Sequence, residues 1–506
     1  MRQLGDAAVL LDVEGGHREA QALARTIRAR DVIAGATTVG VIGEQEELAE
    51  PLAEHAPAVH EIPVVFDGED LGWLGLTAAG LEREIGGKEL EVAHLGFMPG
   101  FAYLVGLPPS LERLGRRASP RTRVPAGSFA VAGGYAGIYP ASSPGGWNLL
   151  GRANVTLFDA DRPPHVLLLP GDRVRLVPVQ SLPHVITPER AALAGDGLEV
   201  LDPGPLSLIE DLGRVGVGSL GVPRAGAANS CWLRIANRAV GNSDGAAAIE
   251  LAGPARFRAL RDVLVALAGH ASLTVAGAER PPGIVAAAGA GQEIAVGPVE
   301  RGARTILAIG GGVTSPRCLG SRSCDAVSGL APGPLRAGDR LDIGAPPLRT
   351  RLRMELPEPG HPVRLRAIDG PDVTGHHLLD GPWVVDARSD RTGVRLRRPE
   401  GHSDLERGDA GVARLAPVAS HAVVPGAVQL PQAGEPVILG PDCGPVGGYP
   451  VAATVITADV WRIGTLAPGD PVEIDLVSVA YAAVARSRLE AAIPQSTKGW
   501  YPTSFA

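Results

Sequence analysis

Glycine and proline constrain this chain more than any other feature of its sequence. The 506 residues include 67 Gly and 45 Pro, which are spread along the whole length. Both residue types interrupt helices, and proline also interrupts the interior of a sheet. Because 45% of the residues are hydrophobic, the chain can still bury real cores. We therefore predict several domains built from many short strands and turns, in a mainly β fold with α+β parts.

Composition and charge exclude several classes of protein. The formal net charge of −8, without a basic stripe, argues against a nucleic-acid partner. No run of about 18 apolar residues is present, and the first residues lack the features of a secretory signal, so we expect a cytoplasmic protein with no membrane contact. Four cysteines do not make a disulfide framework, and no HExxH, CxxC pair or similar spacing indicates a metal site.

The pattern of apolar periods and turn residues divides the chain into units. Alternating strand-like and helix-like periods at the start indicate an α/β subdomain, and short β-type runs between Gly/Pro turns follow it. A helix at 229–242 stands out, with Asn229 or Ser230 as its N-cap. The predicted units are 1–75 (N-terminal α/β subdomain), 76–180 (β-barrel), 181–198 (linker), 199–345 and 346–480 (two β-rich units) and 481–506 (a tail with a short helix and a loose end).

Internal echoes suggest that two of the β-rich units arose by duplication. A Gly-Asp turn before alternating apolar residues recurs at Gly171, Gly338 and Gly469, each time near the end of a unit. A second echo pairs 124–140 with 423–450, because both run from a Val-Pro turn to a Tyr-Pro pair. The first and third units are therefore expected to be related barrels.

The segment His94–Pro108 is the first candidate for a functional site. It gathers Phe97, Phe101 and Tyr103 around a Pro-Gly pair, although the whole chain has few aromatic residues. These rings suit an apolar wall of a ligand cleft, and His94 is a candidate acid or base. A hydrophobic plug beneath a turn explains the pattern equally well.

The segment 119–152 is the second candidate. Its alternating arginines suit a carboxylate or phosphate, which arginine binds in a fork, and its Gly-Gly pair allows close approach of backbone. The alternative is a solvated arginine face beside an ordinary turn. The candidate contacts are Arg121, Arg123, Ser143, Gly146 and Trp147.

The segment 211–229 is the third candidate, and its glycines exclude a helix. It carries Asp211, Arg214, Arg224 and Asn229 and leads into the predicted helix. Donors on a long ordered loop at a helix N-terminus suit an anionic ligand.

These segments closely resemble a known family, bacterial 5-oxoprolinase, whose complex consists of components called A, B and C. HLGFMPGFAYLVGLP, PRTRVPAGSFAVAGG and GIYPASSPGGWNLLGR are similar to the B component. EDLGRVGVGSLGVPRAGAAN, RIANRAVGN, SDRTGVRL and GGYPVAATVITAD are similar to the C component. The same two modules form the carboxyltransferase part of urea amidolyase and have also been named after allophanate hydrolase. The chain therefore resembles a natural fusion of B and C over nearly its whole length.

The resemblance implies cyclophilin-like β-barrels behind the N-terminal α/β subdomain. It also implies ATP-dependent opening of the lactam 5-oxo-L-proline to L-glutamate, with a separate barrel-type A component as partner. ATP would be held by this chain or by that partner, with no metal and no covalently bound biotin here, and a homo-oligomer is left open. This chain departs from the family at two places. Tyr135-Ala136 stand where the family has a Gln-Thr pair, and residues 444–446 stand where it has Gln-Thr-Thr. We predict that these two places are equivalent positions in the two barrels.

The resemblance also implies an active cleft between the two modules. His94 or Asp211 is the expected acid or base, and arginines are expected to hold a carboxylate or phosphate of a small lactam or amide substrate. Two rival functions stay open: a carboxyltransferase component of a biotin-dependent urea carboxylase, and a non-enzymatic inhibitor of a histidine kinase. The expected substrate-binding residues are Phe101, Tyr103, Arg121, Arg123, Ser143, Gly146, Trp147, Arg214, Arg224, Asn229, Ser389, Arg391 and Tyr449.

Overall fold

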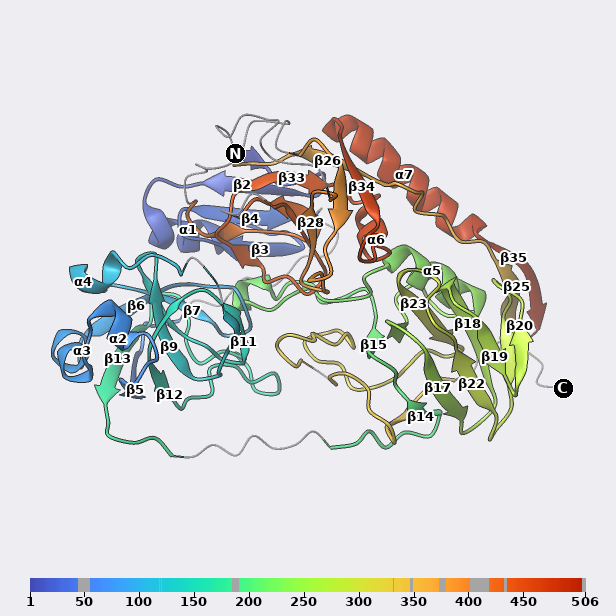
Figure 1. Cartoon of the computed structure of the whole chain (residues 1–506), viewed down its shortest axis with the longest axis horizontal. Helices are drawn as coiled ribbons and strands as arrows, with labels where there is room; N and C mark the ends of the chain where they lie inside the picture. The colour runs from blue at the N-terminus through green and yellow to red at the C-terminus, as the bar shows by residue number, and fades with distance from the viewer. Residues whose placement is uncertain are drawn as a thin grey trace.

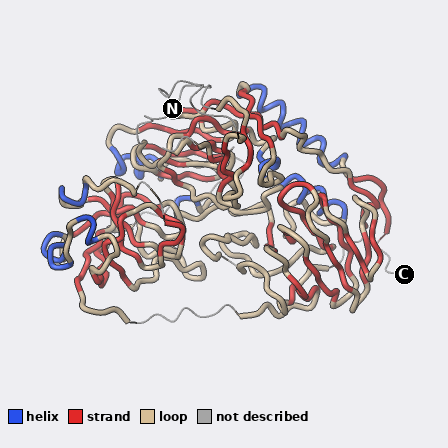
Figure 2. Tube along the Cα trace, viewed as in Figure 1, coloured by secondary structure: helices blue, strands red, loops and turns tan. Residues whose placement is uncertain are grey.

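The computed structural model confirms the prediction of a mainly β chain. Strands hold 37% of the residues and helices 13%, and two sheets close into seven-stranded barrels (Figures 1 and 2). No helix in the described part of the chain is long and apolar enough to cross a membrane. The structure describes residues 1–43, 55–117, 119, 121–183, 191–330, 332–345, 349–372, 379–400, 418–431 and 435–502.

The chain begins with a small antiparallel sheet covered by one helix. Ala20 of the helix packs against Ala34 and Val39 of the sheet. We call this unit the N-terminal subdomain. Its elements, in sheet order, are β1 (Arg2–Gln3), β2 (Ala8–Asp12), β4 (Thr38–Ile42) and β3 (Asp31–Ala34), with α1 (Gly16–Ala24).

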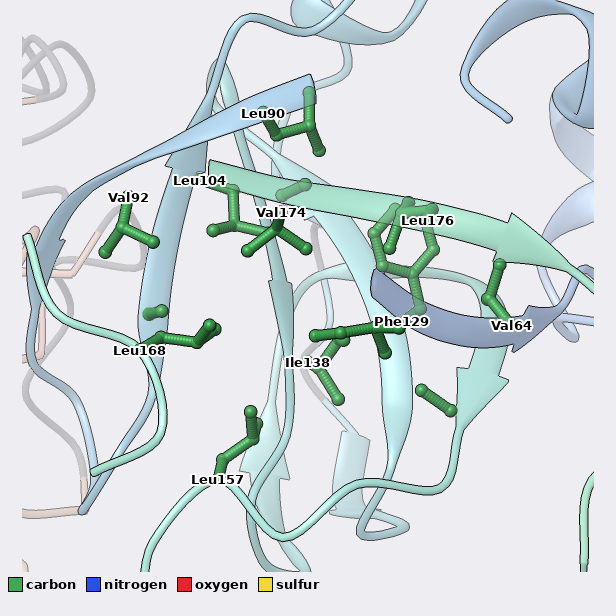
Figure 3. Packing of buried hydrophobic residues seen from close by; sticks show 14 of the residues in the cluster. Val64, Leu90, Val92, Leu104, Phe129, Ile138, Leu157, Leu168, Val174 and Leu176 are labelled. Carbon is green, nitrogen blue, oxygen red and sulfur yellow. The ribbon is translucent and has the colours of Figure 1, made fainter. Parts of the chain in front are cut away.

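The first barrel follows and encloses its own core. Apolar side chains from every part of the ring point inward, among them Val64, Leu90 and Val174 (Figure 3). Its first strand is β5, so the barrel begins at Val59. The boundary between the N-terminal subdomain and the barrel therefore lies before Val59 and not at residue 75, as predicted. The ring order is β10 (Tyr135–Ile138), β7 (Ala102–Val105), β6 (Glu89–Leu95), β13 (Arg173–Pro178), β5 (Val59–Val65), β12 (Asn148–Ala153) and β9 (Ser128–Ala132).

Shorter elements decorate the first barrel. Three helices lie on its outside, and Thr77 caps the second of them by accepting a hydrogen bond from the Gly80 amide at 3.1 Å. A two-stranded sheet stands beside the ring. These elements are α2 (Leu71–Leu74), α3 (Ala78–Glu84), α4 (Pro109–Glu112), β8 (Arg121–Val124) and β11 (Ser143–Gly145).

The second barrel repeats the topology of the first. Taken in chain order, its seven strands occupy the same places in the ring as those of the first barrel, and each barrel has one parallel pair, β5 with β13 and β26 with β34. The shared strand order supports the duplication. The ring is β26 (Val363–Asp369), β33 (Val451–Val455), β30 (Ala427–Gln429), β31 (Val437–Leu439), β28 (Gly393–Arg397), β27 (Trp383–Val385) and β34 (Pro471–Leu476), with β29 (His421–Ala422) and β32 (Val446–Gly447) beside it.

The strand order corrects the register of the second echo. β10, which carries Tyr135-Ala136, corresponds to β31, whereas 444–446 corresponds to the segment before Gly145. The prediction that both barrels lost a polar pair at the same point is therefore wrong. Turn residues recur at many turns of a barrel, so a repeated Tyr-Pro pair does not fix which strand it follows.

In the sequence, a two-layer unit lies between the two barrels. Its core is packed between the two sheets, and α5 (Ser230–Ala239) covers the outer face of the second sheet. Asn229 accepts a hydrogen bond from the Trp232 amide at 2.8 Å, which confirms the predicted helix and its cap. The first sheet has the order β20 (Ala278–Arg280), β19 (Leu273–Val275), β22 (Glu293–Val296), β17 (Ala255–Ala259), β14 (Leu198–Asp202) and β24 (Arg340–Leu341). The second sheet has the order β15 (Ser207–Glu210), β16 (Ala248–Leu251), β23 (Arg301–Ile309), β18 (Val263–His270) and β21 (Ala286–Ala288).

The end of the chain is more ordered than predicted. Helix α7 (Val479–Gln495) runs along the outside of the molecule, and β35 (Thr497–Pro502) pairs with β25 (Arg349–Met354) (Figure 1). The predicted loose end is therefore wrong for 497–502, because its backbone forms hydrogen bonds in a sheet. Residues 184–190 of the predicted linker and residues 503–506 lie outside the described part.

The N-terminal subdomain packs on the second barrel, although the first barrel follows it in the chain. Leu4, Leu10 and Ile33 share a core with Ala422 and residues around it (Figure 1). The first barrel in turn shares its core with the short helix η1 (Gly218–Leu220) of the two-layer unit. The two halves of the sequence are therefore interleaved in space.

Candidate functional site

A cavity of about 250 Å³ lies where three units meet. One wall comes from the N-terminal subdomain, through the β1–β2 turn and the start of β3. The second wall comes from the loop 212–228 that precedes α5. The third wall comes from the second barrel and α6 (Val460–Ile463). Residues from both halves of the chain therefore line one space.

The charged lining of this cavity is rich in arginine. Five guanidinium groups face three carboxylates, and the N-terminus of α5 reaches the cavity through Ala228 and Ser230. Exposed amides at a helix N-terminus add positive potential. The arrangement suits an anionic ligand. The charged lining residues are Asp6, Arg30, Asp31, Arg214, Arg224, Arg304, Asp390 and Arg391.

Arg391 is held by a buried ionic network behind this wall. Its guanidinium donates two hydrogen bonds of 2.8 Å to Asp442 and one of 2.5 Å to Glu250, and Arg304 lies 3.2 Å from the same Glu250. Glu210 lies 3.3 Å from Arg391. The donors of Arg391 are therefore used within the protein, and the residue ties the second barrel to the two-layer unit.

The buried network favours the protonated form of one of its carboxyl groups, Glu210. Burial raises the pKa of Glu210 well above its usual value, and the neighbouring Asp442 and Glu250 raise it further against the opposing effect of Arg391.

The loop before α5 is organised by Asp211. Its carboxylate accepts hydrogen bonds of 2.6 Å from Ser321 and from Ser323, and further bonds from the amides of Gly213 and Arg322. Burial raises the pKa of Asp211, but these hydrogen bonds outweigh it and lower the pKa. Asp211 therefore holds the loop as a carboxylate, and its expected role as acid or base stays a prediction.

Arg214 and Arg224 follow on the same loop and line the cavity. Arg214 is 2% exposed and donates hydrogen bonds to the carbonyls of Cys318 and Ser323. Its Nη1 is buried as well and has no partner in the part of the chain that the structure describes. Arg224 donates to the carbonyl of Leu212 at 3.5 Å. Asn229 is occupied as the cap of α5. The loop thus brings two of its four predicted site residues into the cavity.

Asp31 is a site residue that sequence reasoning missed. It begins β3, lines the cavity and accepts a hydrogen bond from the Gly218 amide at 3.3 Å. Burial raises the pKa of Asp31 to about 6, although the nearby Arg224 and Arg30 oppose the shift. A carboxyl group that titrates near neutral pH suits proton transfer. An aspartate at the start of a β-strand gives no sequence signal of this kind, because the groups that bury it come from distant segments.

The aromatic segment of the first barrel forms a separate cluster. His94 is fully buried, and its ring stacks on Tyr103 with centroids 4.3 Å apart. Neither ring nitrogen has a hydrogen-bond partner among the described residues. Burial lowers the pKa of His94 to about 3, so the ring is neutral at pH 7. Phe101 and Trp147 pack edge to face with centroids 5.4 Å apart. His94 as an acid or base stays a prediction, which its environment does not favour.

This aromatic cluster lies directly behind the cavity wall. Gly100 donates a hydrogen bond to the Leu220 carbonyl at 3.0 Å, and a side chain on Gly444 would meet the Phe97 carbonyl at 2.2 Å. The loops that carry Leu220 and Gly444 also line the cavity, through neighbouring residues such as Val222 and Cys443. The cluster therefore supports the wall from outside and does not face the cavity.

The arginines of the second candidate segment have partners outside the cavity. Arg121 donates to Asp70 at 2.7 Å, and Arg123 donates to Ser142 at 3.1 Å. Four other predicted residues, Ser143, Gly146, Ser389 and Tyr449, are not part of the cavity lining. The Ser143 hydroxyl donates to Pro144 O, and the Gly146 carbonyl accepts from the Arg117 amide. Arg116 lies over the ring of Tyr449, and the Ser389 hydroxyl accepts from the Arg395 amide.

The structure thus gathers Arg214, Arg224 and Arg391 of the predicted residues in one cavity and leaves the aromatic set in a second layer. Cys443 also lines the cavity, but burial raises the pKa of its thiol to about 12, so it is not an activated nucleophile. Within the described ranges, no group of three His, Cys, Asp or Glu side chains is placed to hold a metal ion.

Two family models match the chain and together span most of it. Residues 1–168 match the model described as carboxyltransferase domain, subdomain C and D, and residues 220–476 match carboxyltransferase domain, subdomain A and B. The C component of 5-oxoprolinase from Escherichia coli K12 is 30% identical over 309 residues, which are 57% of this chain and 94% of that protein. The B component from Escherichia coli O157:H7 is 44% identical over 142 residues, 27% of this chain and 63% of that protein.

Two further relatives extend the comparison. The urea amidolyase of Lachancea kluyveri is 30% identical over 328 residues, which cover 58% of this chain but 18% of that enzyme. Among solved structures, TTHA0988 superposes with a TM-score of 0.79 at 32% identity and covers 92% of this chain and 99% of its own. The Kluyveromyces lactis urea carboxylase superposes with a TM-score of 0.53 at 27% identity, covering 60% of this chain and 29% of its own.

Proposed function

The chain belongs to the carboxyltransferase-domain family and is a fusion of two parts, which are similar to the B and C components of 5-oxoprolinase. On this premise, we propose that it is a component of a 5-oxoprolinase-type amidohydrolase. The observation that supports this most is the cavity itself. Side chains from the B-like N-terminal subdomain and from the C-like half line it together. A substrate site of this kind is complete only when both parts are present.

The proposed reaction converts 5-oxo-L-proline, ATP and two molecules of water to L-glutamate, ADP and phosphate, with a separate A component as partner. A lactam is a poor electrophile, and phosphorylation of its oxygen makes ring opening feasible. In this chain Arg214 and the N-terminus of α5 would hold the anionic end of the substrate. Asp31, with a pKa of about 6, would take up or release a proton near the reacting amide.

The test is reconstitution with the barrel-type A component from the same source. We expect ATP hydrolysis that depends on 5-oxo-L-proline and releases one L-glutamate for each phosphate. This chain alone and the A component alone serve as controls and should release none. Absence of glutamate from the complete mixture would remove the proposal.

A second candidate is supported by the similarity to urea amidolyase and urea carboxylase. In that case the chain would transfer a carboxyl group from carboxybiotin on a partner protein to a small amide such as urea. A mixture of this chain, a biotin carboxylase, a biotinylated carrier, bicarbonate, ATP and urea distinguishes the two. Urea-dependent ATP turnover that needs biotinylated carrier would favour this candidate over the first.

A further inference from the structure

The polar ends of the aromatic cluster in the first barrel lack partners inside the protein. Tyr103, Tyr139 and Trp147 are at most 7% exposed, so nearly all of each side chain is buried. Among the described residues, none forms a hydrogen bond with the two hydroxyls or with the indole N–H, and none of these three polar atoms is completely covered. Buried tyrosine and tryptophan side chains normally find a partner for their polar ends. These ends are therefore placed to meet a group from outside the protein.

The hydroxyl groups of Tyr103, Tyr135 and Tyr139 lie close to one another and to Arg116. The ring centroids of Tyr103 and Tyr135 are 5.4 Å apart. Burial raises the pKa of Tyr103 to about 12, the charge of Arg116 opposes this shift, and Tyr135 adds to it. Burial also raises the pKa of Tyr139, Tyr103 adds to that shift, and Arg116 opposes it. These hydroxyls therefore share one environment and stay protonated at neutral pH, as hydrogen-bond donors.

Arg116 brings a positive charge to these hydroxyls. It is exposed, and no carboxylate in the described part of the chain forms an ion pair with it. Its loop is held beside the cluster, because the Arg117 amide donates to the Gly146 carbonyl at 2.8 Å. From the other side the second barrel approaches: the Cζ of Arg116 lies 5.4 Å from the ring centroid of Tyr449, and a side chain on Gly448 would meet its Nη2 at 2.5 Å. Hydrogen-bond donors thus collect where the two barrels meet.

We propose that this part of the aromatic cluster is a second binding site, separate from the cavity, for a small ligand that presents a carboxylate or phosphate group. Such a group accepts several hydrogen bonds at once, and hydrogen bonds to a charged acceptor are stronger than those between neutral groups. The phenols and the indole N–H would satisfy its lone pairs, and Arg116 would supply the opposite charge. None of these residues lines the cavity, so the proposal goes beyond the proposed function and does not depend on it.

Calorimetric titration of the purified full chain tests the site. The probes are 5-oxo-L-proline for a carboxylate, inorganic phosphate for a free phosphate and ATP for a phosphate carried by a nucleotide, and we expect at least one of them to bind. Tyr103→Phe and Tyr139→Phe each remove a hydroxyl that has no partner among the described residues. Each variant should therefore keep the wild-type midpoint of thermal unfolding and bind that probe about five- to tenfold more weakly. Tyr481→Phe is the matched control, because Tyr481 is exposed on α7, and it should bind as the wild type does.

Two further variants test the charge and the location of the site. Arg116→Gln should weaken binding of the same probe at least about tenfold. Its control is Arg258→Gln, since Arg258 is exposed on β17 and pairs with Glu199 at 2.9 Å. Binding should also change the intrinsic fluorescence of the protein, and Trp147→Phe should remove most of this change.

The outcomes separate the possible ligands from one another and from an absence of the site. Binding of 5-oxo-L-proline that the tyrosine variants weaken identifies a carboxylate ligand, and the same result with phosphate or ATP identifies a phosphate ligand. The proposal is wrong if none of the three probes binds at about 10 mM. It is also wrong if neither tyrosine variant weakens the binding of any probe. A reconstituted complex that releases no glutamate would overturn the proposed function and leave this site in place.

Discussion

At the scale of single residues, Asp31 couples the stability of the fold to the proposed chemistry. Burial raises its pKa to about 6, so between the ordinary carboxyl pKa and pH 6 the folded chain holds a proton that the unfolded chain has released. The protonated Asp31 therefore costs no stability at low pH. As the pH rises toward 6, this residue lowers the free energy of unfolding. Above pH 6 the loss reaches up to about 3 kcal/mol.

Asp31→Asn should remove this loss. We expect the variant to be more stable than the wild type at pH 7.5, by about 1–3 kcal/mol in the free energy of unfolding measured in urea. The difference should vanish near pH 4, where the wild-type carboxyl is largely protonated in the folded state and no longer costs stability. If Asp31 transfers a proton, the same variant should lower kcat in the reconstituted complex. Equal stability of variant and wild type at pH 7.5 would contradict the assigned pKa.

His94 has the opposite pH dependence in the same molecule. Because its pKa is about 3 in the folded chain, His94 stays neutral between pH 6.5 and 3, whereas the same residue in the unfolded chain is protonated. The free energy of unfolding therefore falls as the pH is lowered through this range. His94→Phe keeps an aromatic ring against Tyr103 and removes the titrating group. We expect its unfolding free energy at pH 7 to lie within about 1.5 kcal/mol of the wild type. Its thermal midpoint should fall less than that of the wild type when the pH is lowered from 7 to 4.5.

The activity of the His94→Phe variant decides the role of this histidine. Retained turnover in the reconstituted complex would assign His94 to packing behind the cavity wall. Loss of turnover in a variant that folds with wild-type stability would assign it to the chemistry instead.

At the scale of elements, Arg391 joins the second barrel to the two-layer unit. Arg391→Met would leave Asp442 and Glu250 facing each other without their main cation, and we expect a loss of about 3–5 kcal/mol in the free energy of unfolding. Arg388→Met is the control. Arg388 lies three residues away, is mostly exposed and pairs with Asp386 and Glu435, so its loss should cost less than about 1 kcal/mol. Urea unfolding of both variants checks the difference.

The sequence was informative where local rules decide the structure. Asn229 before an apolar run predicts a helix cap, and the glycines of 211–229 predict a loop. Both statements depend only on neighbours in the chain. The tail shows the limit of such reasoning, because a strand at 497–502 forms only when β25, far away in the sequence, offers it a partner.

The candidate site was harder to predict because its parts come from distant segments. Arg214, Arg224 and Arg391 were chosen for their chemistry, and the structure brings all three to one cavity. Asp31 was missed because its burial depends on Gly218, 187 residues later in the chain. Arginine patterns alone also do not show that Arg121 is already paired with Asp70.

At the scale of the whole molecule, the N-terminal subdomain bridges the two halves of the chain. It precedes the first barrel in sequence but packs on the second barrel, and hydrogen bonds from Thr457 to Asp6 hold it there. It also supplies the wall of the cavity that carries Asp31. The cavity therefore depends on how closely this subdomain approaches the second barrel.

Gly40 sets that approach, because a Cβ at this position would lie 2.2 Å from the Cβ of Ala422 on the second barrel. Gly40→Ala should push β4 away from β29 and cost about 1–3 kcal/mol of stability. Since β3 pairs with β4, Asp31 should move with it, and the affinity for 5-oxo-L-proline measured by titration should fall. Gly72→Ala, in α2 with open space around it, should leave binding unchanged and stabilise the fold slightly. Wild-type affinity and stability in Gly40→Ala would show that the cavity does not depend on this contact.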